Sequence, residues 1–149
     1  MQQNIPEHTL LGRNGEDYAA QMLQKKGYQI EDRNWRIGHF EVDIIASNRN
    51  EIVFVEVKAR TTMFGNIRPE EYVDEAKKRR MITSGNAFVR HCKSNKALRF
   101  DIIGIVVDPN TMEVTYRTHI ENAFQPTTRA ITSGSHSAGW LWHKGTKKR

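Results

Sequence analysis

The sequence predicts an α/β protein in which helices pack against a mixed β-sheet. Apolar residues recur at helical spacing through residues 11–26, which indicates an amphipathic helix. Two runs rich in β-branched residues, 40–46 and 52–59, flank the segment SNRN, which is a strong hairpin signal. Residues 98–107 are apolar almost throughout, as is typical of a central strand. In chain order the elements read α-β-β-β-α-β-β, and this order favours one mixed sheet with helices packed against it.

The first helix is expected to span residues 11–26. Ala19 and Leu23 lie on one face, and Gly27 follows where a left-handed C-terminal cap belongs. Glu16 precedes Ala19 by three residues and Leu23 by seven, so it projects from the same face one turn earlier. A carboxylate is therefore expected beside the apolar stripe of this helix.

The remaining elements follow from turn signals and periodicity. Residues 28–37 are expected to form a first strand with polar interruptions, before the hairpin. Pro69 opens a second helical segment that extends to about Cys92, and Gly85 weakens this helix locally. After the central strand, a proline-containing turn leads into an edge strand over residues 112–118.

The chain is expected to divide into a folded part and a tail. Its 149 residues suit one domain, which we place over residues 1–124. Residues 125–149 are rich in Ser, Thr and Gly and end in a basic cluster, which predicts a flexible basic C-terminal tail.

The composition limits the compartment and the partners. A formal net charge of +6 favours polyanionic partners such as nucleic acid. Cys92 is the only cysteine, so neither an intramolecular disulfide nor a cysteine-rich zinc site can form. The N-terminus lacks the pattern of a secretory signal, and the longest apolar run, residues 102–107, is far shorter than the roughly 20 residues that span a membrane. We therefore expect a soluble cytoplasmic protein without a membrane partner.

Charged residues stand inside both strands of the predicted hairpin, where burial makes them unfavourable unless they are paired. A tight turn places residues whose numbers sum to 99 opposite one another. Asp43 then faces Glu56, and Glu41 faces Lys58. Opposite charges explain the second pair. The two carboxylates of the first pair repel each other and need either a shared proton or a cation between them.

A divalent cation that prefers oxygen ligands resolves this conflict. Mg²⁺ is usually held by one or two carboxylates, and water and substrate phosphate complete its octahedron. Asp43 and Glu56 would be the ligands, with the Val57 carbonyl as a third. Lys58 would orient an attacking water or stabilise the charge that develops on a phosphorane. Glu16 would enter the same site from the helix and assist the water shell of the metal.

This pattern also has a purely structural interpretation. An acidic residue followed two positions later by lysine in a strand usually belongs to a cross-strand salt bridge. The complete set favours a metal-dependent site over that interpretation, because its carboxylates come from a helix and from both hairpin strands of a basic chain.

The same residues resemble the pattern of the PD-(D/E)xK nuclease superfamily: a helix glutamate, a strand aspartate, and Glu-x-Lys on the next strand. More narrowly, the chain resembles the UPF0102, or YraN-like, family of small bacterial proteins from about Leu11 to Phe124. The segments that carry this resemblance are NGEDYAAQMLQKKGYQI, DRNWR, EVDIIA, IVFVEVKAR, FGNIRPEE, LRFDIIGI and HIENAF. Val42 departs from the superfamily pattern, whose name implies a proline at this position.

The resemblance implies a fold, a site and a cofactor. The family is regarded as distantly related to archaeal Holliday-junction resolvases, which implies a restriction-endonuclease-like mixed β-sheet flanked by helices. By position, Glu16 matches the helix glutamate and Asp43 the first metal ligand. Glu56 and Lys58 match the Glu-x-Lys pair. The implied cofactor is Mg²⁺ or Mn²⁺. Because junction resolvases act as dimers, the resemblance also points to a homodimer.

Three further cations are candidate contacts for nucleic-acid phosphates. Arg60 lies at the end of the second hairpin strand, and Lys77 and Arg80 lie three residues apart on one face of the second helix. Lys77 and Arg80 belong to the run KKRR, which also fits a solvated helix face, and that alternative stays open. Lys78 and Arg79 are expected to face water.

The sequence leads to one main hypothesis and two alternatives. The main hypothesis is a Mg²⁺- or Mn²⁺-dependent endonuclease-like protein that binds and cleaves DNA, with structured or branched DNA as the candidate substrate. The first alternative is a non-catalytic nucleic-acid-binding or adaptor protein that retains the nuclease fold. The second is a structural carboxylate–lysine cluster with a protein partner. The intact set of Asp43, Glu56 and Lys58 favours catalysis.

Overall fold

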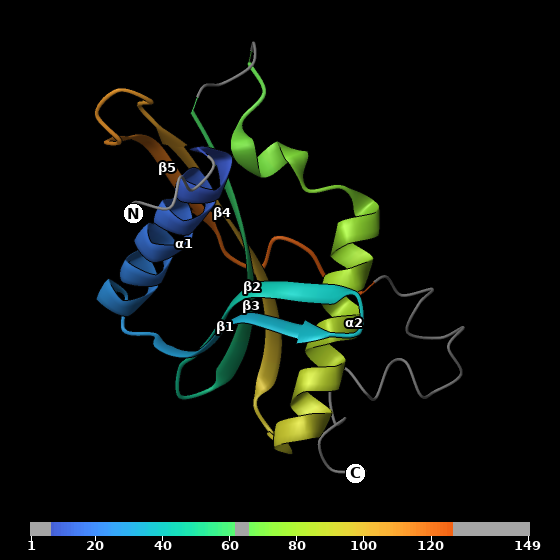
Figure 1. Cartoon of the computed structure of the whole chain (residues 1–149). Helices are drawn as coiled ribbons and strands as arrows, with labels where there is room; N and C mark the ends of the chain where they lie inside the picture. Colours follow the sequence, from blue (N-terminus) through green and yellow to red (C-terminus); the bar gives the residue numbers. More distant parts are fainter. Residues whose placement is uncertain (1–6, 62–65, 127–149) are drawn as a thin grey trace, which may run out of the picture.

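The structure is a computed structural model of the chain, and it describes residues 7–61 and 66–126. The tail predicted over residues 125–149 lies outside the described residues from residue 127 onward. The elements, in chain order, are α1 (Glu7–Lys25), β1 (Gln29–Ile37), β2 (Phe40–Ser47), β3 (Glu51–Arg60), the 3₁₀ turn η1 (Pro69–Tyr72), α2 (Glu75–Cys92), β4 (Ala97–Val107) and β5 (Val114–Ile120) (Figure 1). The predicted α/β class and the predicted order of helices and strands are confirmed.

The five strands form one mixed sheet in the order β1-β2-β3-β4-β5. β3 and β4 are parallel, and α2 connects them, as a parallel pair requires. The other neighbouring strands are antiparallel. The mixed sheet predicted from the element order is therefore confirmed.

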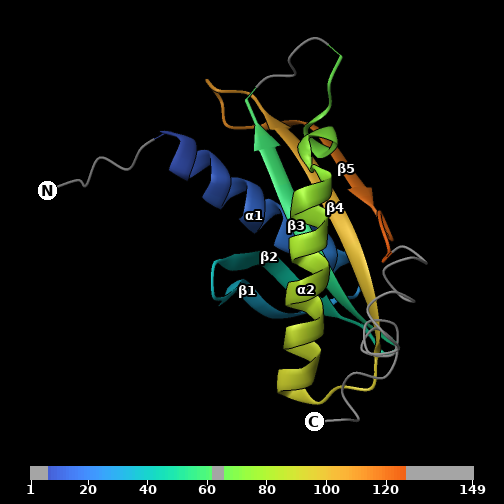
Figure 2. The same cartoon turned by 90° about the vertical axis from the view of Figure 1, so that its right-hand side faces the viewer.

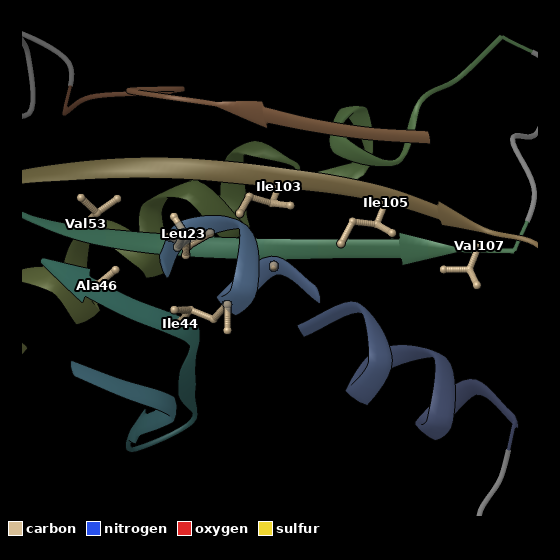
Figure 3. Close-up of a cluster of buried hydrophobic side chains, with 10 residues drawn as sticks. Leu23, Ile44, Ala46, Val53, Ile103, Ile105 and Val107 are labelled. Carbon is tan, nitrogen blue, oxygen red and sulfur yellow. The ribbon is translucent and has the colours of Figure 1, made fainter. Parts of the chain in front are cut away.

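The two long helices cover opposite faces of this sheet (Figures 1 and 2). Leu23 of α1 packs with Val53 and Val55 of β3 in one core, part of which Figure 3 shows. Met81 of α2 packs with Phe54 in a second core. Because Phe54 lies between Val53 and Val55, the alternation of side chains along β3 feeds both cores.

The hairpin of β2 and β3 has the predicted register. Ile44 pairs with Val55, and the partners continue to Ser47 and Ile52, so each pair of numbers sums to 99. Asn48 closes the turn, since its Oδ1 accepts hydrogen bonds from the N–H groups of the second and third residues that follow it. The turn chemistry that the SNRN segment indicates thus sets the register of the charged residues.

The helix predicted from Pro69 to Cys92 is interrupted. Pro69–Tyr72 form only a 3₁₀ turn, and α2 begins at Glu75. Asp74 has extended backbone angles, and its carboxylate accepts a hydrogen bond from the backbone N–H of Lys77, which is the geometry of an N-cap. The cap therefore starts a new helix at Glu75.

Gly85 does not break α2. A Cβ at this position would lie 3.0 Å from the ring of Phe100 and 3.2 Å from the ring of Phe54. The missing side chain lets the helix backbone approach the aromatic residues of the sheet, so close packing opposes the intrinsic weakness of glycine in a helix.

The last strand starts later than predicted. β5 spans Val114–Ile120 instead of residues 112–118, because the preceding turn is longer. Asp108 accepts hydrogen bonds from the N–H groups of Asn110 and Thr111, and Met112 has a φ of 60°, which ends the turn in the left-handed region. The predicted position of this strand at the edge of the sheet is confirmed.

No helix in the described parts of the chain is long and apolar enough to cross a membrane.

Candidate functional site

Asp43 lies where the β2–β3 ladder stops. The last pair of this ladder is Ile44 with Val55. Asp43 is the next residue of β2 beyond that pair, directly before Ile44 in the chain. Its Oδ2 accepts a hydrogen bond of 2.8 Å from the backbone N–H of Val57. A carboxylate side chain thus takes the place that a backbone carbonyl would occupy in a continuing ladder, and it is fixed against β3.

Glu56 is buried beside this point. It is 4% exposed, and its Oε2 accepts no hydrogen bond, although Lys77 Nζ lies 3.3 Å away. Lys58 Nζ lies 3.9 Å from the other carboxylate oxygen, Oε1. A buried carboxylate with an oxygen that accepts no hydrogen bond is unfavourable. Oε2 has the Lys77 ammonium as a charge partner but no hydrogen-bond donor.

Burial raises the pKa values of both carboxyl groups. The pKa of Glu56 rises to about 7, because burial and then the charge of Asp43 disfavour its ionised form, while Lys77 and Lys58 oppose the rise. Burial also raises the pKa of Asp43, against the opposing effects of the Val57 N–H and Lys77. The charge of Asp43 thus acts on Glu56, although the β2–β3 ladder ends at Ile44 and Val55 and does not pair the two residues.

Glu16 reaches the same region from α1. Gly15 packs so closely on β3 that a Cβ there would lie 2.7 Å from the Cβ of Ala59, which brings this part of α1 against the sheet. Burial, followed by the charge of Asp43, raises the pKa of Glu16, while Asn34 and Arg33 oppose this. Glu16 therefore belongs to the electrostatic environment of Asp43.

The donor set fits a divalent ion with hard oxygen preferences. Within residues 7–61 and 66–126, no group of three or more His, Cys, Asp or Glu side chains is placed to hold a metal ion. Asp43 and Glu56 supply two carboxylates, which is the number that usually holds Mg²⁺. The N–H and C=O of a strand residue point to the same edge of the strand, so the Val57 carbonyl faces the side on which Asp43 lies. The unsatisfied oxygen of Glu56 completes the fit.

The predicted pairing of Glu41 with Lys58 is wrong. Glu41 instead lies 3.4 Å from Arg36 of β1, which stands opposite it in the β1–β2 ladder. Lys58 approaches Glu56 on its own strand. The β2–β3 ladder ends before it reaches these positions, so the register no longer brings them together.

The three predicted phosphate contacts have different surroundings. Lys77 points into the carboxylate cluster, 3.3 Å from Glu56. Arg60 lies over the ring of Tyr72 at 5.3 Å and donates to the carbonyl of Ala59. Arg80 is exposed, one turn beyond Lys77. The structure therefore brings Lys77 to the carboxylates and leaves Arg80 on the surface.

Lys78 is expected to face water, but the structure gives it partners. Its Nζ lies 3.0 Å from Glu75 and 5.9 Å from the ring centroid of Phe124. Arg79 is exposed, as predicted.

Glu70 is a buried carboxylate that sequence reasoning missed. Its Oε1 accepts a hydrogen bond of 2.7 Å from the Tyr116 hydroxyl, and its Oε2 accepts none. The carboxylate occupies the space that a side chain at Gly104 would fill, and Gly104 is the β4 partner of Lys58. Glu70 therefore lies on the same sheet face as Lys58, one strand away. The neighbouring proline in the sequence marks a turn but gives no signal of this burial.

Comparisons with known proteins point to one family. The model of the family described as "Uncharacterised protein family UPF0102" matches residues 15–105. A UPF0102 protein of Phocaeicola vulgatus is 46% identical over 125 residues, which covers 82% of this chain and 98% of that relative. UPF0102 proteins of Bacteroides thetaiotaomicron and Porphyromonas gingivalis are 41% and 42% identical, over 82% and 80% of this chain and 98% and 87% of those relatives.

Proposed function

This chain belongs to the UPF0102 family, and from that premise we propose that it is a metal-dependent nuclease that binds DNA and hydrolyses its phosphodiester bonds. The observation that carries the proposal is the pair of half-buried Asp43 and buried Glu56, in which Oε2 of Glu56 accepts no hydrogen bond. A bound Mg²⁺ or Mn²⁺ ion would relieve the repulsion between the two carboxylates. The placement of the fold in the PD-(D/E)xK superfamily is part of the same proposal.

Each side chain of the cluster has a defined task in this proposal. Asp43, oriented by the Val57 N–H, and Glu56 hold the metal, with the Val57 carbonyl as a third donor. The chemistry that such an ion supplies is Lewis-acid activation of water and neutralisation of phosphate charge. Lys58 places an ammonium group beside Glu56, where it can orient the attacking water or stabilise charge on the phosphorane.

Lys77 and Glu16 support this pair of metal ligands. The Lys77 ammonium, 3.3 Å from Glu56, opposes the rise in the pKa of that carboxyl and so favours its ionised, metal-binding form. Glu16 adds a further carboxylate on the α1 side, next to Asp43. Arg60 and Arg80 would bind the phosphates that flank the scissile bond.

One observation favours a second candidate function, a non-catalytic nucleic-acid-binding protein. The Lys77 ammonium already lies at the Glu56 oxygen that a metal ion would use. A lysine can neutralise a carboxylate pair in place of a metal ion, and the nuclease fold would then survive without turnover.

A cleavage assay separates the two candidates. The full chain is incubated with four-way junction, flap, single-stranded and duplex DNA in Mg²⁺ or Mn²⁺, next to Asp43→Asn and Lys58→Ala. Glu113→Gln, an exposed carboxylate next to the β4–β5 turn, serves as the matched control. We expect cleavage by the native chain and the control, and a loss on the order of a hundredfold or more in both site variants. Binding without cleavage, equal in all variants, would leave only the second candidate.

Calorimetry with Mn²⁺ tests the metal site without turnover. Asp43→Asn and Glu56→Gln should each weaken Mn²⁺ binding by about tenfold or more, and Glu113→Gln should leave it unchanged. If the native chain takes up no Mn²⁺ at millimolar concentration, Asp43 and Glu56 are not a metal site.

A further inference from the structure

A small cationic pocket lies on the α1 side of the sheet, away from α2. It has a volume of about 230 Å³, and its lining residues come from α1, the residue that follows it, and β5. They are Tyr18, Gln21, Met22, Lys25, Lys26 and Arg117. Three of these six described residues are cations and none is acidic, so the pocket carries an excess of positive charge.

Lys26 is held in place by a buried relay. Its Nζ lies 2.8 Å from His119 Nδ1, and His119 Nε2 lies 2.7 Å from Asp101 Oδ2. An ammonium group can only donate, so Nδ1 is the acceptor and the proton of the ring is on Nε2, which donates to Asp101. The side chain of His119 is 2% exposed and that of Asp101 is 0% exposed. A rigid pair of buried groups therefore orients one exposed lysine.

The cations of this pocket have no acidic partners among the residues that the structure describes. Arg117 donates to the hydroxyl of Tyr18, and Lys26 donates to a neutral imidazole. Among the described side chains, no carboxylate forms an ion pair with Lys25, Lys26 or Arg117. In the carboxylate cluster, by contrast, Lys77 and Lys58 both face Glu56. The pocket thus has donors and positive charge, and residues 7–61 and 66–126 supply it with no counterion.

The end of α1 does not by itself explain this arrangement. Cations near a helix C-terminus are stabilised by the helix dipole, and Lys25 in the last turn fits that role. Arg117, however, lies on β5, and Lys26 points to His119 and not to a helix carbonyl. Two of the three cations are therefore positioned by contacts of α1 and the residue that follows it with β5.

We infer that this pocket is a binding site for a phosphate group. Its volume is below the roughly 300–1,000 Å³ of pockets for drug-sized ligands, so it suits a small anion with its water better than a whole cofactor. A guanidinium and two ammonium groups, with the Tyr18 hydroxyl, match the several acceptor oxygens and the high charge of a phosphate. The site is independent of the proposed metal chemistry, because the Asp43–Glu56 cluster contributes no residue to its lining.

Titration of the full chain with inorganic phosphate in EDTA tests this site in the absence of any cleavage. Lys26→Gln and Arg117→Gln should each weaken phosphate binding by about tenfold, because each removes a charge-assisted hydrogen bond. Arg90→Gln on α2 makes the same change in net charge on the other face of the sheet and should alter binding less than twofold. The nitrogen NMR signal of His119 Nδ1 should shift on phosphate binding in the native chain, because the anion changes the charge environment of the Lys26 ammonium that donates to this nitrogen.

Two oligonucleotides identify the source of the phosphate. The native chain is compared on two oligonucleotides of the same sequence, one with a 5′-phosphate and one without. The site binds a terminal phosphate if the native chain prefers the phosphorylated oligonucleotide and both Lys26→Gln and Arg117→Gln lose this preference. The site binds backbone phosphodiesters if the two oligonucleotides bind equally well and both substitutions, but not Arg90→Gln, weaken that binding. If both variants bind phosphate and the oligonucleotides like the native chain, the site does not exist, whatever the cleavage assay shows.

Discussion

Glu56 is buried near a second carboxylate, Asp43, and both effects raise its pKa. This raised pKa determines how the free energy of unfolding changes with pH. The pKa of Glu56 is about 7 in the folded chain against an ordinary value of 4.5. Between these values the folded state binds more protons than the unfolded state, so the free energy of unfolding falls as pH rises. The stabilisation is complete below about pH 4.5 and is lost as pH passes through 7. The raised pKa of Asp43 acts in the same direction.

Without metal, the native chain should therefore be more stable at pH 5 than at pH 8, and Glu56→Gln should reduce this difference. One pKa unit corresponds to about 1.4 kcal/mol, so the contribution of Glu56 is on the order of 2–3 kcal/mol. Urea unfolding in EDTA at both pH values measures it. Glu113→Gln should retain the pH dependence of the native chain. An unchanged pH dependence of stability in Glu56→Gln would show that the Glu56 carboxyl group does not have a raised pKa in the folded chain.

The approach of Asp43 to Glu56 could be predicted from the sequence, because a tight turn fixes the register of a hairpin by simple counting. The contact of Lys77 with Glu56 could not be predicted in this way. It depends on where α2 begins and how that helix lies on the sheet, which are properties of tertiary packing. The contact of Lys26 with His119 spans 93 positions and has no local signal.

At the scale of elements, the approach of α1 to β3 brings Glu16 to the site. Gly15 allows this approach because its missing side chain leaves room for Ala59. Helix propensity alone would favour alanine over glycine inside α1 by about 1 kcal/mol. The contact with β3 thus outweighs propensity at this position.

Gly15→Ala should consequently destabilise the protein by about 1–3 kcal/mol, because the added methyl group would overlap Ala59 and push α1 away from the sheet. Asn14→Ala, at the exposed neighbouring position, gains the same helix propensity without this overlap and should not destabilise. Urea unfolding compares the two variants. If Gly15→Ala proves as stable as Asn14→Ala, the contact between α1 and β3 does not set the position of Glu16.

Element types could be predicted more reliably than their ends. Periodicity and β-branched runs identify two long helices and five strands, because those patterns reflect which face is buried. The start of α2 was missed, since Pro69 and Asp74 are both helix-start signals and only packing decides between them. The start of β5 was missed because Asp108 stabilises a longer turn through its side chain.

At the scale of the whole molecule, the positive charge is unevenly divided between the described part and the C-terminal residues. The net charge of +6 suggests a basic surface. Residues 1–126 contain 18 of the 23 Lys and Arg residues and all 17 Asp and Glu residues, so their net charge is only +1. The remaining basic residues are Arg129, Lys144, Lys147, Lys148 and Arg149. Any binding to nucleic acid that depends on net charge should therefore depend on residues 127–149.

The proposed sites and these C-terminal cations make separable contributions to DNA binding. Each protein–phosphate contact adds about 0.7–0.9 to the slope of log Kd against log salt concentration. Replacing all five C-terminal cations with Gln should lower this slope by up to about 4 while Mn²⁺ binding stays unchanged. Fluorescence anisotropy in EDTA, at salt concentrations from about 50 to 200 mM, measures this slope. A chain in which each of the five is exchanged between Lys and Arg keeps the charge and should retain the native slope. An unchanged slope in the Gln chain would assign the phosphate contacts to the folded part instead, where Arg80 of α2 and the pocket of Lys25, Lys26 and Arg117 are the proposed contacts.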